Sequence, residues 1–160
     1  MKFLKFLIFI PILLAATPQA SETKTEVNWT DFNTGFQQAQ DEGKVAVIDC
    51  YTDWCGWCKK MDKNTFAVDS IAKRLNKDYI SIKFNPEKPG TYYTGSDTLN
   101  GKQLLLALSN NKPGGYPTTF FFVPQTNQMF QVPGYMDAKK FDEMLDNVER
   151  YQKAKTLKTR

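Results

Sequence analysis

The 160-residue chain contains no histidine. Hydrolases of the Ser–His and Cys–His kinds need an imidazole, and ordinary zinc sites combine histidine with cysteine. The chain has three cysteines, too few for a four-thiolate zinc site. The sequence therefore argues against histidine-dependent hydrolysis, and we expect no metal.

An apolar run long enough to span a membrane is also lacking. The run over residues 6–16 is eleven residues long, whereas a spanning helix needs about 20. Lys2 and Lys5 precede the run and small residues follow it, a layout typical of a secretory signal peptide. We expect residues 1–20 to be removed near Ala20 and the protein to be periplasmic or otherwise exported. The alternative is a membrane anchor.

A large excess of charge is missing as well. The formal charge of +4 becomes +2 once residues 1–20, with their two lysines and no acid, are removed. So small a charge does not indicate a nucleic-acid partner. We expect a monomer. The 41% of hydrophobic residues can form a core, and the length of 160 residues predicts one domain, over residues 28–152. A flexible leader (21–27) would precede it, and a basic tail (153–160) would follow it.

The stretch "VAVIDCYTDWCGWCKK" holds all three cysteines. Its first seven residues, 45–51, form an apolar, β-branched run that predicts a strand covered on both faces. We expect a helix to begin at or near Cys55, where free amides and the helix dipole would stabilise a thiolate. Cys58, three residues on, could then attack a mixed disulfide. The alternative is an inert disulfide or two unreactive thiols.

The rest of the chain alternates between helical and strand patterns. The order fits an α/β fold in which a mixed sheet is flanked by helices. The segment 86–117 is the least regular and has room for an inserted loop. The pattern predicts further helices over 29–43 (capped by Thr30), 69–78 (capped by Asp69 or Ser70), 102–109 and 137–155, and further strands over 79–85, 118–123 and 129–132.

The segment "DWCGWCKKMDKNTF" after "VIDCYT" resembles the active-site region of the thioredoxin superfamily. It is closer to the exported thioredoxin-like group that includes the C-terminal domain of DsbD-type thiol:disulfide interchange proteins. The resemblance implies a three-layer α/β fold with a mixed central sheet and an insertion at 86–115. Gly56 and Trp57 stand where cytosolic thioredoxin has Gly-Pro, and these two residues tune the thiolate.

The segment "GGYPTTFFF" resembles the superfamily's cis-proline segment. The resemblance implies a cis bond before Pro117, which would present the backbone of Tyr116 to an extended substrate. Thr118 follows the proline, and Gly134 resembles the glycine that lets a substrate backbone approach. The alternatives are an ordinary trans proline and a plain turn glycine.

Asp49 lies six positions before Cys55. The resemblance implies a buried carboxyl that relays a proton to Cys58; the alternative is an acid facing solvent at the strand end. Cys50 points to the opposite face of the strand, where we expect a buried, inert thiol. A regulatory role for Cys50 is the alternative.

These observations and the resemblance together predict an exported thiol–disulfide oxidoreductase, most simply a reductase. Its partners would be protein thiols or disulfides and a membrane thiol reductant donor. No cofactor is needed, because electrons pass through protein thiols. The alternatives are an oxidase or isomerase, or a peptide-binding module with a structural disulfide. The expected catalytic residues are Cys55, Cys58 and Asp49, and the expected substrate contacts are Trp54, Gly56, Trp57, Tyr116, Pro117, Thr118 and Gly134.

The reacting sulfurs should be surrounded by an apolar rim. Trp57 and Tyr116 are its expected members, and Tyr92 and Tyr93 of the insertion are candidates to contribute.

Overall fold

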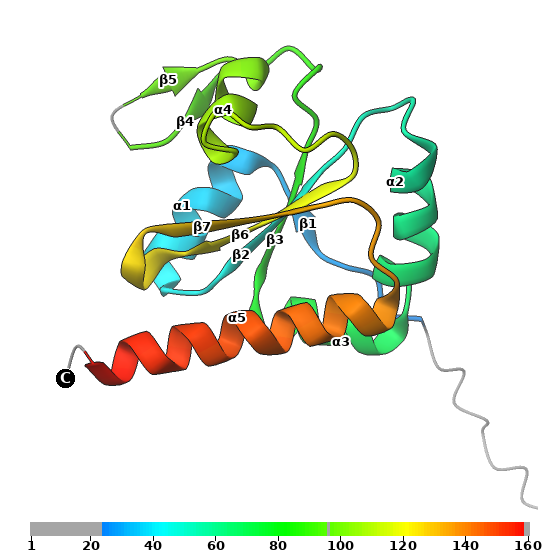
Figure 1. Ribbon diagram of the computed structural model, residues 1–160, viewed down its shortest axis with the longest axis vertical. Coiled ribbons are helices and arrows are strands. Elements are labelled where there is room, and N and C mark those ends of the chain that lie inside the picture. The colour runs from blue at the N-terminus through cyan, green and yellow to red at the C-terminus, as the bar shows by residue number, and fades with distance from the viewer. Residues whose placement is uncertain (1–23, 96, 159–160) are drawn as a thin grey trace, which may run out of the picture.

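A five-stranded mixed sheet forms the centre of the protein (Figure 1). The computed structural model describes residues 24–95 and 97–158. The strand order is β1-β3-β2-β6-β7; β1, β3 and β2 are parallel, whereas β6 and β7 are antiparallel to their neighbours. The predicted α/β fold is confirmed. The strands are β1 (Trp29–Thr30), β2 (Ala46–Cys50), β3 (Ile80–Phe84), β6 (Thr118–Val123) and β7 (Gln128–Pro133).

Helices cover both faces of this sheet (Figure 1). One face packs against α1 (Phe32–Glu42) and α4 (Gly101–Leu108). The other face packs against a helical segment after β2 and against two further helices. That segment is α2 (Gly56–Met61) with the π-helix η1 (Asp62–Phe66), and the other two helices are α3 (Asp69–Asp78) and α5 (Ala138–Lys158).

The central strand β2 is buried along its whole length, as its β-branched composition predicts. Its side chains alternate between the two cores because successive residues of a strand point to opposite faces. Val47 packs on the α2 side, whereas Ile48 and Cys50 pack on the α1 side. Asp49 therefore points toward the layer that contains α2, and Cys50 points away from it.

The start of α1 differs from the prediction. Trp29 and Thr30 pair with Ser81 and Ile82 as the edge strand β1, so they are not the first turn of a helix. Asp31 caps α1 instead, and its side chain accepts a hydrogen bond from the Thr34 N–H at 3.0 Å. Hydrogen bonding to the sheet overrides the helical spacing of Trp29 here.

The predicted cap of α3 is also wrong. Val68 is the N-cap residue and makes no side-chain cap bond. Asp69 lies inside the first turn, where its carboxylate accepts a hydrogen bond from the Thr25 N–H and pairs with Lys73 at 2.7 Å. The Asp69 carboxylate is thus bound by Thr25 and Lys73 and does not cap α3.

The inserted segment 86–115 carries more structure than the sequence predicts. Asn100 and Gln103 form a capping box at the start of α4, one residue before the predicted helix. An unpredicted two-stranded sheet, β4 (Tyr92–Tyr93) with β5 (Thr98–Leu99), precedes α4. Asn33 of α1 holds this sheet, because its side chain bonds the Thr91 carbonyl and the Tyr93 N–H, both at 2.9 Å.

The structure adds detail at both ends of the domain. Helix α5 continues to Lys158, through the segment expected to be a basic tail. Asn76 donates a hydrogen bond to the Glu26 carbonyl at 2.8 Å, which ties part of the expected leader to α3. The predicted signal peptide lies outside the described residues. Within residues 24–95 and 97–158, no helix is both long and apolar enough to cross a bilayer.

Candidate functional site

The cysteine pair lies where β2 gives way to α2. Cys55 is the N-cap residue of α2, and its Sγ accepts a hydrogen bond from the Cys58 N–H at 3.1 Å. The two sulfurs form a disulfide of 2.10 Å. Both cysteines are largely buried, at 4% and 3% exposed. The predicted helix start at Cys55 is confirmed, and it directs free N–H groups at the outer sulfur.

The peptide bond between Tyr116 and Pro117 is cis, as expected. Strand β6 begins at the next residue, and its Thr118 is paired with Cys50 at the end of β2. This register places the cis-proline beside the chain segment that leads to Cys55. Thr118 Oγ1 donates to the Gly115 carbonyl at 2.8 Å and so closes the turn that holds the proline.

Gly134 is fixed next to the same turn. Its N–H donates to the Pro117 carbonyl at 2.8 Å, and its φ of 92° lies in the left-handed region. A Cβ at this position would meet nothing within 4 Å. The conformation, and not crowding, therefore requires glycine here.

Aromatic rings flank the disulfide-bearing turn. Trp54 and Trp57 are 67% and 56% exposed. Trp54 packs edge-on against Tyr116 at 5.7 Å, and Trp57 packs against Tyr135 at 5.6 Å. The two tryptophans, one just before Cys55 and one just before Cys58, thus place exposed apolar surface next to the disulfide. A Cβ on Gly56, between the two tryptophans, would also meet nothing within 4 Å.

Two contacts of this aromatic rim could not be predicted from a motif. Tyr135 had no pattern to mark it, other than its place directly after Gly134. Glu87, in the insertion, accepts a hydrogen bond from Trp54 Nε1 at 2.9 Å and so links the insertion to the site. Tyr92, a candidate for the rim, packs edge-on against Phe32 and Phe84.

A buried carboxylate lies on the α2 side of the sheet. Asp49 is 2% exposed, and its Oδ2 accepts from Lys83 Nζ at 2.6 Å. Its other oxygen, Oδ1, has no hydrogen-bond partner among the described residues. Burial raises the pKa of Asp49 because it removes the carboxylate from water, and the charge of Lys83 offsets part of that rise.

Lys83 is another residue of this site that the sequence analysis did not identify. It lies opposite Asp49 in the parallel register of β2 and β3, and it also pairs with Asp62 just beyond α2. Burial alone would lower the pKa of Lys83, but the two carboxylates raise it overall. One feature of the sequence could have indicated this pair: Lys83 lies in an otherwise apolar strand, and that strand follows the one that contains Asp49.

Lys83 and Asp62 also line an open pocket of about 340 Å³, with Trp29 and Phe66 among its other walls. The Lys83 ammonium lies over the Trp29 ring, 4.7 Å from its centroid. The pocket gives the two charged ends access to solvent.

The fold and the arrangement of this site identify the family. The sequence matches the Thioredoxin-like domain family over residues 32–149, which include the cysteine pair, Asp49 and the cis-proline. The chain belongs to this thioredoxin-like family. The resemblance seen in the Cys55 and Pro117 segments is thus confirmed.

Similarity to named proteins agrees with membership in the thioredoxin-like family. The chain is 31% identical to the thiol:disulfide interchange protein DsbD of Yersinia pestis over 111 residues, which are 68% of this chain and 17% of that protein. It is 31% identical to DsbD of Escherichia coli K12 over 131 residues, 78% of this chain and 21% of that protein. The chain thus spans about a fifth of the length of these relatives.

Solved structures share the thioredoxin-like fold at low sequence identity. A thioredoxin from Thermus thermophilus superposes with a TM-score of 0.61 at 16% identity, covering 81% of this chain and 91% of that one. The DsbH oxidoreductase superposes with a TM-score of 0.55 at 14% identity, covering 87% and 96%. At these identities the likeness concerns the fold alone.

Two features of the thioredoxin-like domain lie outside the cysteine site. Cys50 is fully buried among the side chains of the α1 core, and burial raises the pKa of its thiol far above the ordinary value; its predicted burial is confirmed. Among the described residues, no group of three or more His, Cys, Asp or Glu side chains is placed to hold a metal ion.

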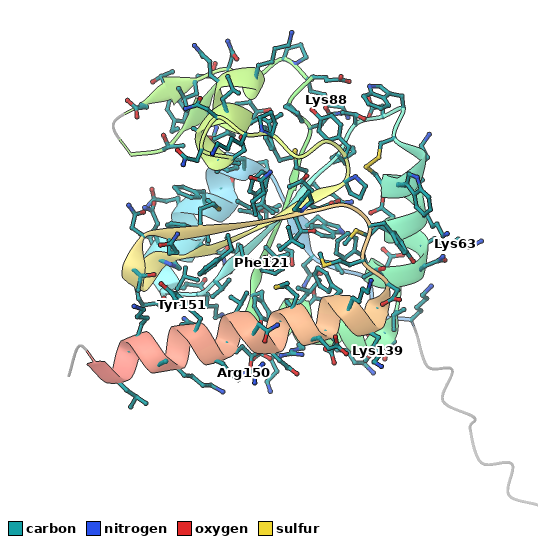
Figure 2. All side chains as sticks on the ribbon, viewed as in Figure 1. Lys63, Lys88, Phe121, Lys139, Arg150 and Tyr151 are labelled. Atoms are coloured by element: carbon teal, nitrogen blue, oxygen red, sulfur yellow. A yellow bond between two sulfur atoms is a disulfide. The ribbon has the colours of Figure 1, made fainter. Side chains whose placement is uncertain are left out.

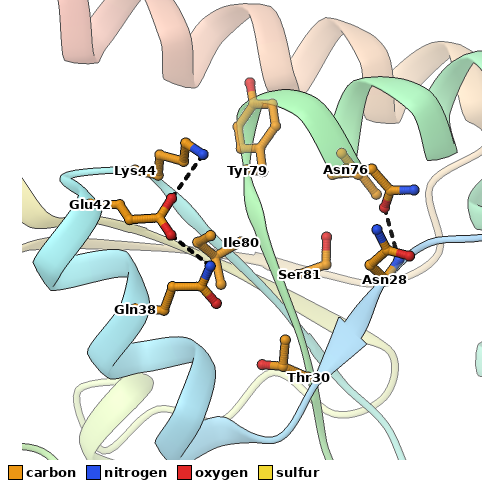
Figure 3. Close-up of a pocket in the computed structure, with 10 residues that line it drawn as sticks. Asn28, Thr30, Gln38, Glu42, Lys44, Asn76, Tyr79, Ile80 and Ser81 are labelled. Carbon is orange, nitrogen blue, oxygen red and sulfur yellow. Dashed lines mark hydrogen bonds and ion pairs between the residues drawn. The ribbon is translucent and has the colours of Figure 1, made fainter.

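A polar pocket of about 210 Å³ lies at the other end of the sheet (Figure 3). Ser81 lines it, and the Ser81 hydroxyl has no hydrogen-bond partner within the part of the chain that the structure describes. Glu42 binds Lys44 at 2.8 Å and Gln38 at 2.7 Å on its wall. Lys44 and Ser81 lie at the beginnings of β2 and β3, whereas Cys55 follows the end of β2. This pocket therefore has no part in the chemistry of the cysteine pair.

Proposed function

We propose that the protein is a thiol–disulfide oxidoreductase that reduces disulfides in protein substrates. The observation that carries the proposal is the placement of Cys55 at the N-cap of α2, within bonding distance of Cys58. Membership in the thioredoxin-like family and the similarity to DsbD support it.

In the reduced protein, Cys55 is the attacking group. Its thiolate, stabilised by the free N–H groups of α2, attacks one sulfur of the substrate disulfide. A mixed disulfide forms between Cys55 and the substrate, and the other substrate sulfur leaves as a thiolate. The substrate backbone pairs with that of Tyr116, next to the cis-proline, while Trp54 and Trp57 contact its side chains.

Cys58 then completes the exchange. Asp49, on the face of β2 that α2 covers, accepts the Cys58 proton through its raised pKa. The Cys58 thiolate attacks Cys55 Sγ, forms the Cys55–Cys58 disulfide and releases the second substrate thiolate. Two electrons have passed to the substrate, whose two sulfurs take up protons from the solvent and from Asp49.

Repeated turnover requires a dithiol protein that reduces Cys55–Cys58 by the reverse exchange. We propose that this donor is a membrane thiol reductant, because residues 1–20 indicate export to an oxidising compartment. The protein would act there as a monomer, without a metal or a cofactor.

The direct test is reduction of insulin with dithiothreitol as electron source. We expect activity in the parent protein, none in Cys55→Ser, and accumulation of mixed disulfides in Cys58→Ser. Cys50→Ser is the matched control and should retain activity, because Cys50 is buried on the opposite face of β2. Absence of insulin reduction, with a Cys55–Cys58 bond that resists mild reductant, would instead favour a peptide-binding module.

The direction of the reaction is tested separately. Equilibration of the cysteine pair against glutathione gives its reduction potential, and about 30 mV corresponds to roughly 1.4 kcal/mol for two electrons. We expect a potential in the reducing range near thioredoxin, about −270 mV. A potential near that of a strong oxidant, about −120 mV, would contradict the reductase assignment.

A further inference from the structure

Three lysines follow the cysteine pair on the exposed side of α2 and η1. Lys59, Lys60 and Lys63 are exposed, and none has an ion-pair partner among the described residues. We refer to these three residues as the lysine ridge. Figure 2 shows Lys63 directed outward from this helical segment.

The acids closest to the lysine ridge in the sequence are already paired. Asp62, which lies between the lysines, binds Lys83. Asp53, before the cysteine pair, lies 3.5 Å from Lys88. The positive charge of the ridge is therefore not cancelled by a neighbouring acid of its own segment.

The ridge lies close enough to the reacting sulfurs to act on a docked partner. A helix rises 1.5 Å per residue, which places the ridge within about 12 Å of Cys55 along the axis. Screening in about 0.1 M salt extends over about 10 Å. Lys60 contacts the aromatic rim, with its ammonium 4.5 Å from the Trp57 ring centroid and 5.3 Å from that of Tyr135.

Exposed lysines do little to a fixed thiolate through water. Their larger effect is on a charged molecule that approaches, because a local field raises the rate of encounter with the opposite charge. A partner that reaches Cys55 passes over the aromatic rim and meets the ridge on the α2 side.

We propose that the lysine ridge selects protein partners whose reacting cysteine is flanked by acidic side chains. The inference rests on the proposed thiol–disulfide exchange and adds the charge of the partner to it. The bonds made and broken stay the same: the Cys55 thiolate attacks the partner disulfide, and the partner's other sulfur leaves as a thiolate. The ridge changes only how often that encounter occurs.

The test uses three synthetic peptides that carry one cysteine as a mixed disulfide with thionitrobenzoate. The peptides differ only in having glutamate, glutamine or lysine on both sides of the cysteine. Release of the coloured thiolate by the fully reduced protein is followed by stopped flow. At low salt we expect the glutamate peptide to react about tenfold faster than the lysine peptide. The ratio should approach one in about 1 M salt.

The variant Lys59→Gln/Lys63→Gln removes two of the three ridge charges and should reduce this preference, while Lys60 is kept because its ammonium contacts the Trp57 ring. The control variant Lys153→Gln/Lys155→Gln removes the same amount of charge near the C-terminal end of α5, away from α2 (Figure 1). This control should keep the preference for the glutamate peptide. Urea unfolding of both variants shows that each is folded. The inference is overturned if the parent shows no preference, or if both variants lose it equally. Failure to react with any of the three peptides would instead contradict the proposed function itself.

Discussion

Asp49 and Lys83 form a buried pair that joins the stability of the protein to its chemistry. The two residues face each other on β2 and β3, and their side chains are 2% and 22% exposed. Removing one partner of a buried pair costs about 3–5 kcal/mol when the remaining charge is left unpaired. Lys83 also has Asp62 as a partner, so the loss of Asp49 leaves it a salt bridge.

The raised pKa of Asp49 predicts a pH dependence of stability. Between the unfolded pKa, near 3.8, and the higher folded pKa, the native protein holds a proton that the unfolded chain has lost. The free energy of unfolding must therefore fall as the pH rises through this window, by at most about 1.4 kcal/mol per pH unit. Asp49→Asn should lack this fall and gain stability over the parent as the pH rises.

Urea unfolding of the oxidised protein, from about pH 4 to about pH 9, measures this difference. In the parent protein the Asp49 and Asp62 carboxylates raise the pKa of Lys83 above the ordinary lysine value, so Lys83 stays charged over that range. Asp53→Asn is the matched control, since the Asp53 side chain is 70% exposed. Parallel curves for the parent and Asp49→Asn would show that Asp49 does not titrate in this window.

Single residues of the site were predictable to the extent that they belong to local motifs. Cys55 and Cys58 can be identified from their spacing, and Pro117 can be identified from the strand pattern that follows it. Lys83 and Tyr135 become part of the site only through the register of β3 and the turn after β7. A linear pattern does not contain such contacts, because they depend on which strands become neighbours.

At the scale of elements, periodicity predicted the long segments and failed at short ones. Strand β2 and helix α4 were predicted almost to their bounds, since each carries an apolar pattern of its own. Strand β1 has two residues and exists because β3 offers it hydrogen bonds. The β4–β5 sheet likewise depends on the side chain of Asn33. Tertiary contacts, and not local propensity, decide such short elements.

The close contact between α1 and the sheet gives an element-level prediction. A Cβ on Gly35 would lie 2.4 Å from Thr30 Oγ1 and 2.5 Å from Ile82 Cγ1. Gly35→Ala should therefore push α1 away from β1 and β3 and cost about 1–3 kcal/mol. The expected loss already includes the higher helix propensity of alanine, which by itself would stabilise the helix by about 1 kcal/mol.

Gly56→Ala provides the comparison, because Gly56 begins α2 and a Cβ there has open space. We expect its unfolding free energy to change by less than about 1 kcal/mol, in the stabilising direction. The urea midpoints of the two oxidised variants measure the difference in stability between Gly35→Ala and Gly56→Ala. Equal midpoints would mean that α1 can shift without cost, and that its packing on Ile82 is loose.

At the scale of the whole molecule, the topology assembles the site from distant parts of the chain. Strand β2 delivers the cysteine pair, β6 delivers the cis-proline, and their antiparallel pairing joins Cys50 to Thr118. The α/β class and the mixed sheet followed from the order of elements. How the insertion packs did not follow, because Glu87 and Asn33 act on residues far away in sequence.

Helix α5 closes one face of the molecule, and its contacts predict where the domain ends. Arg74 of α3 binds Asp142, Asp146 and Glu149 of α5 at 2.6–2.8 Å. Figure 2 shows Tyr151 between α5 and the sheet, and its ring meets Phe130 at 4.9 Å. These contacts all lie before residue 153. In the expected tail, Leu157 is 76% exposed, so the removal of its side chain would cost little buried apolar surface.

Two truncations test this boundary. A chain that ends at Gln152 should unfold within about 0.5 kcal/mol of the parent, because residues 153–157 are exposed and a pair such as Lys153–Glu149, at 3.9 Å, lies in solvent. A chain that ends at Asn147 loses the buried Val148, the Glu149 partner of Arg74 and the Tyr151 ring, and should lose at least about 3 kcal/mol. Urea unfolding at one pH compares the three chains. If ending the chain at Gln152 cost as much as ending it at Asn147, the last turns of α5 would belong to the folded domain.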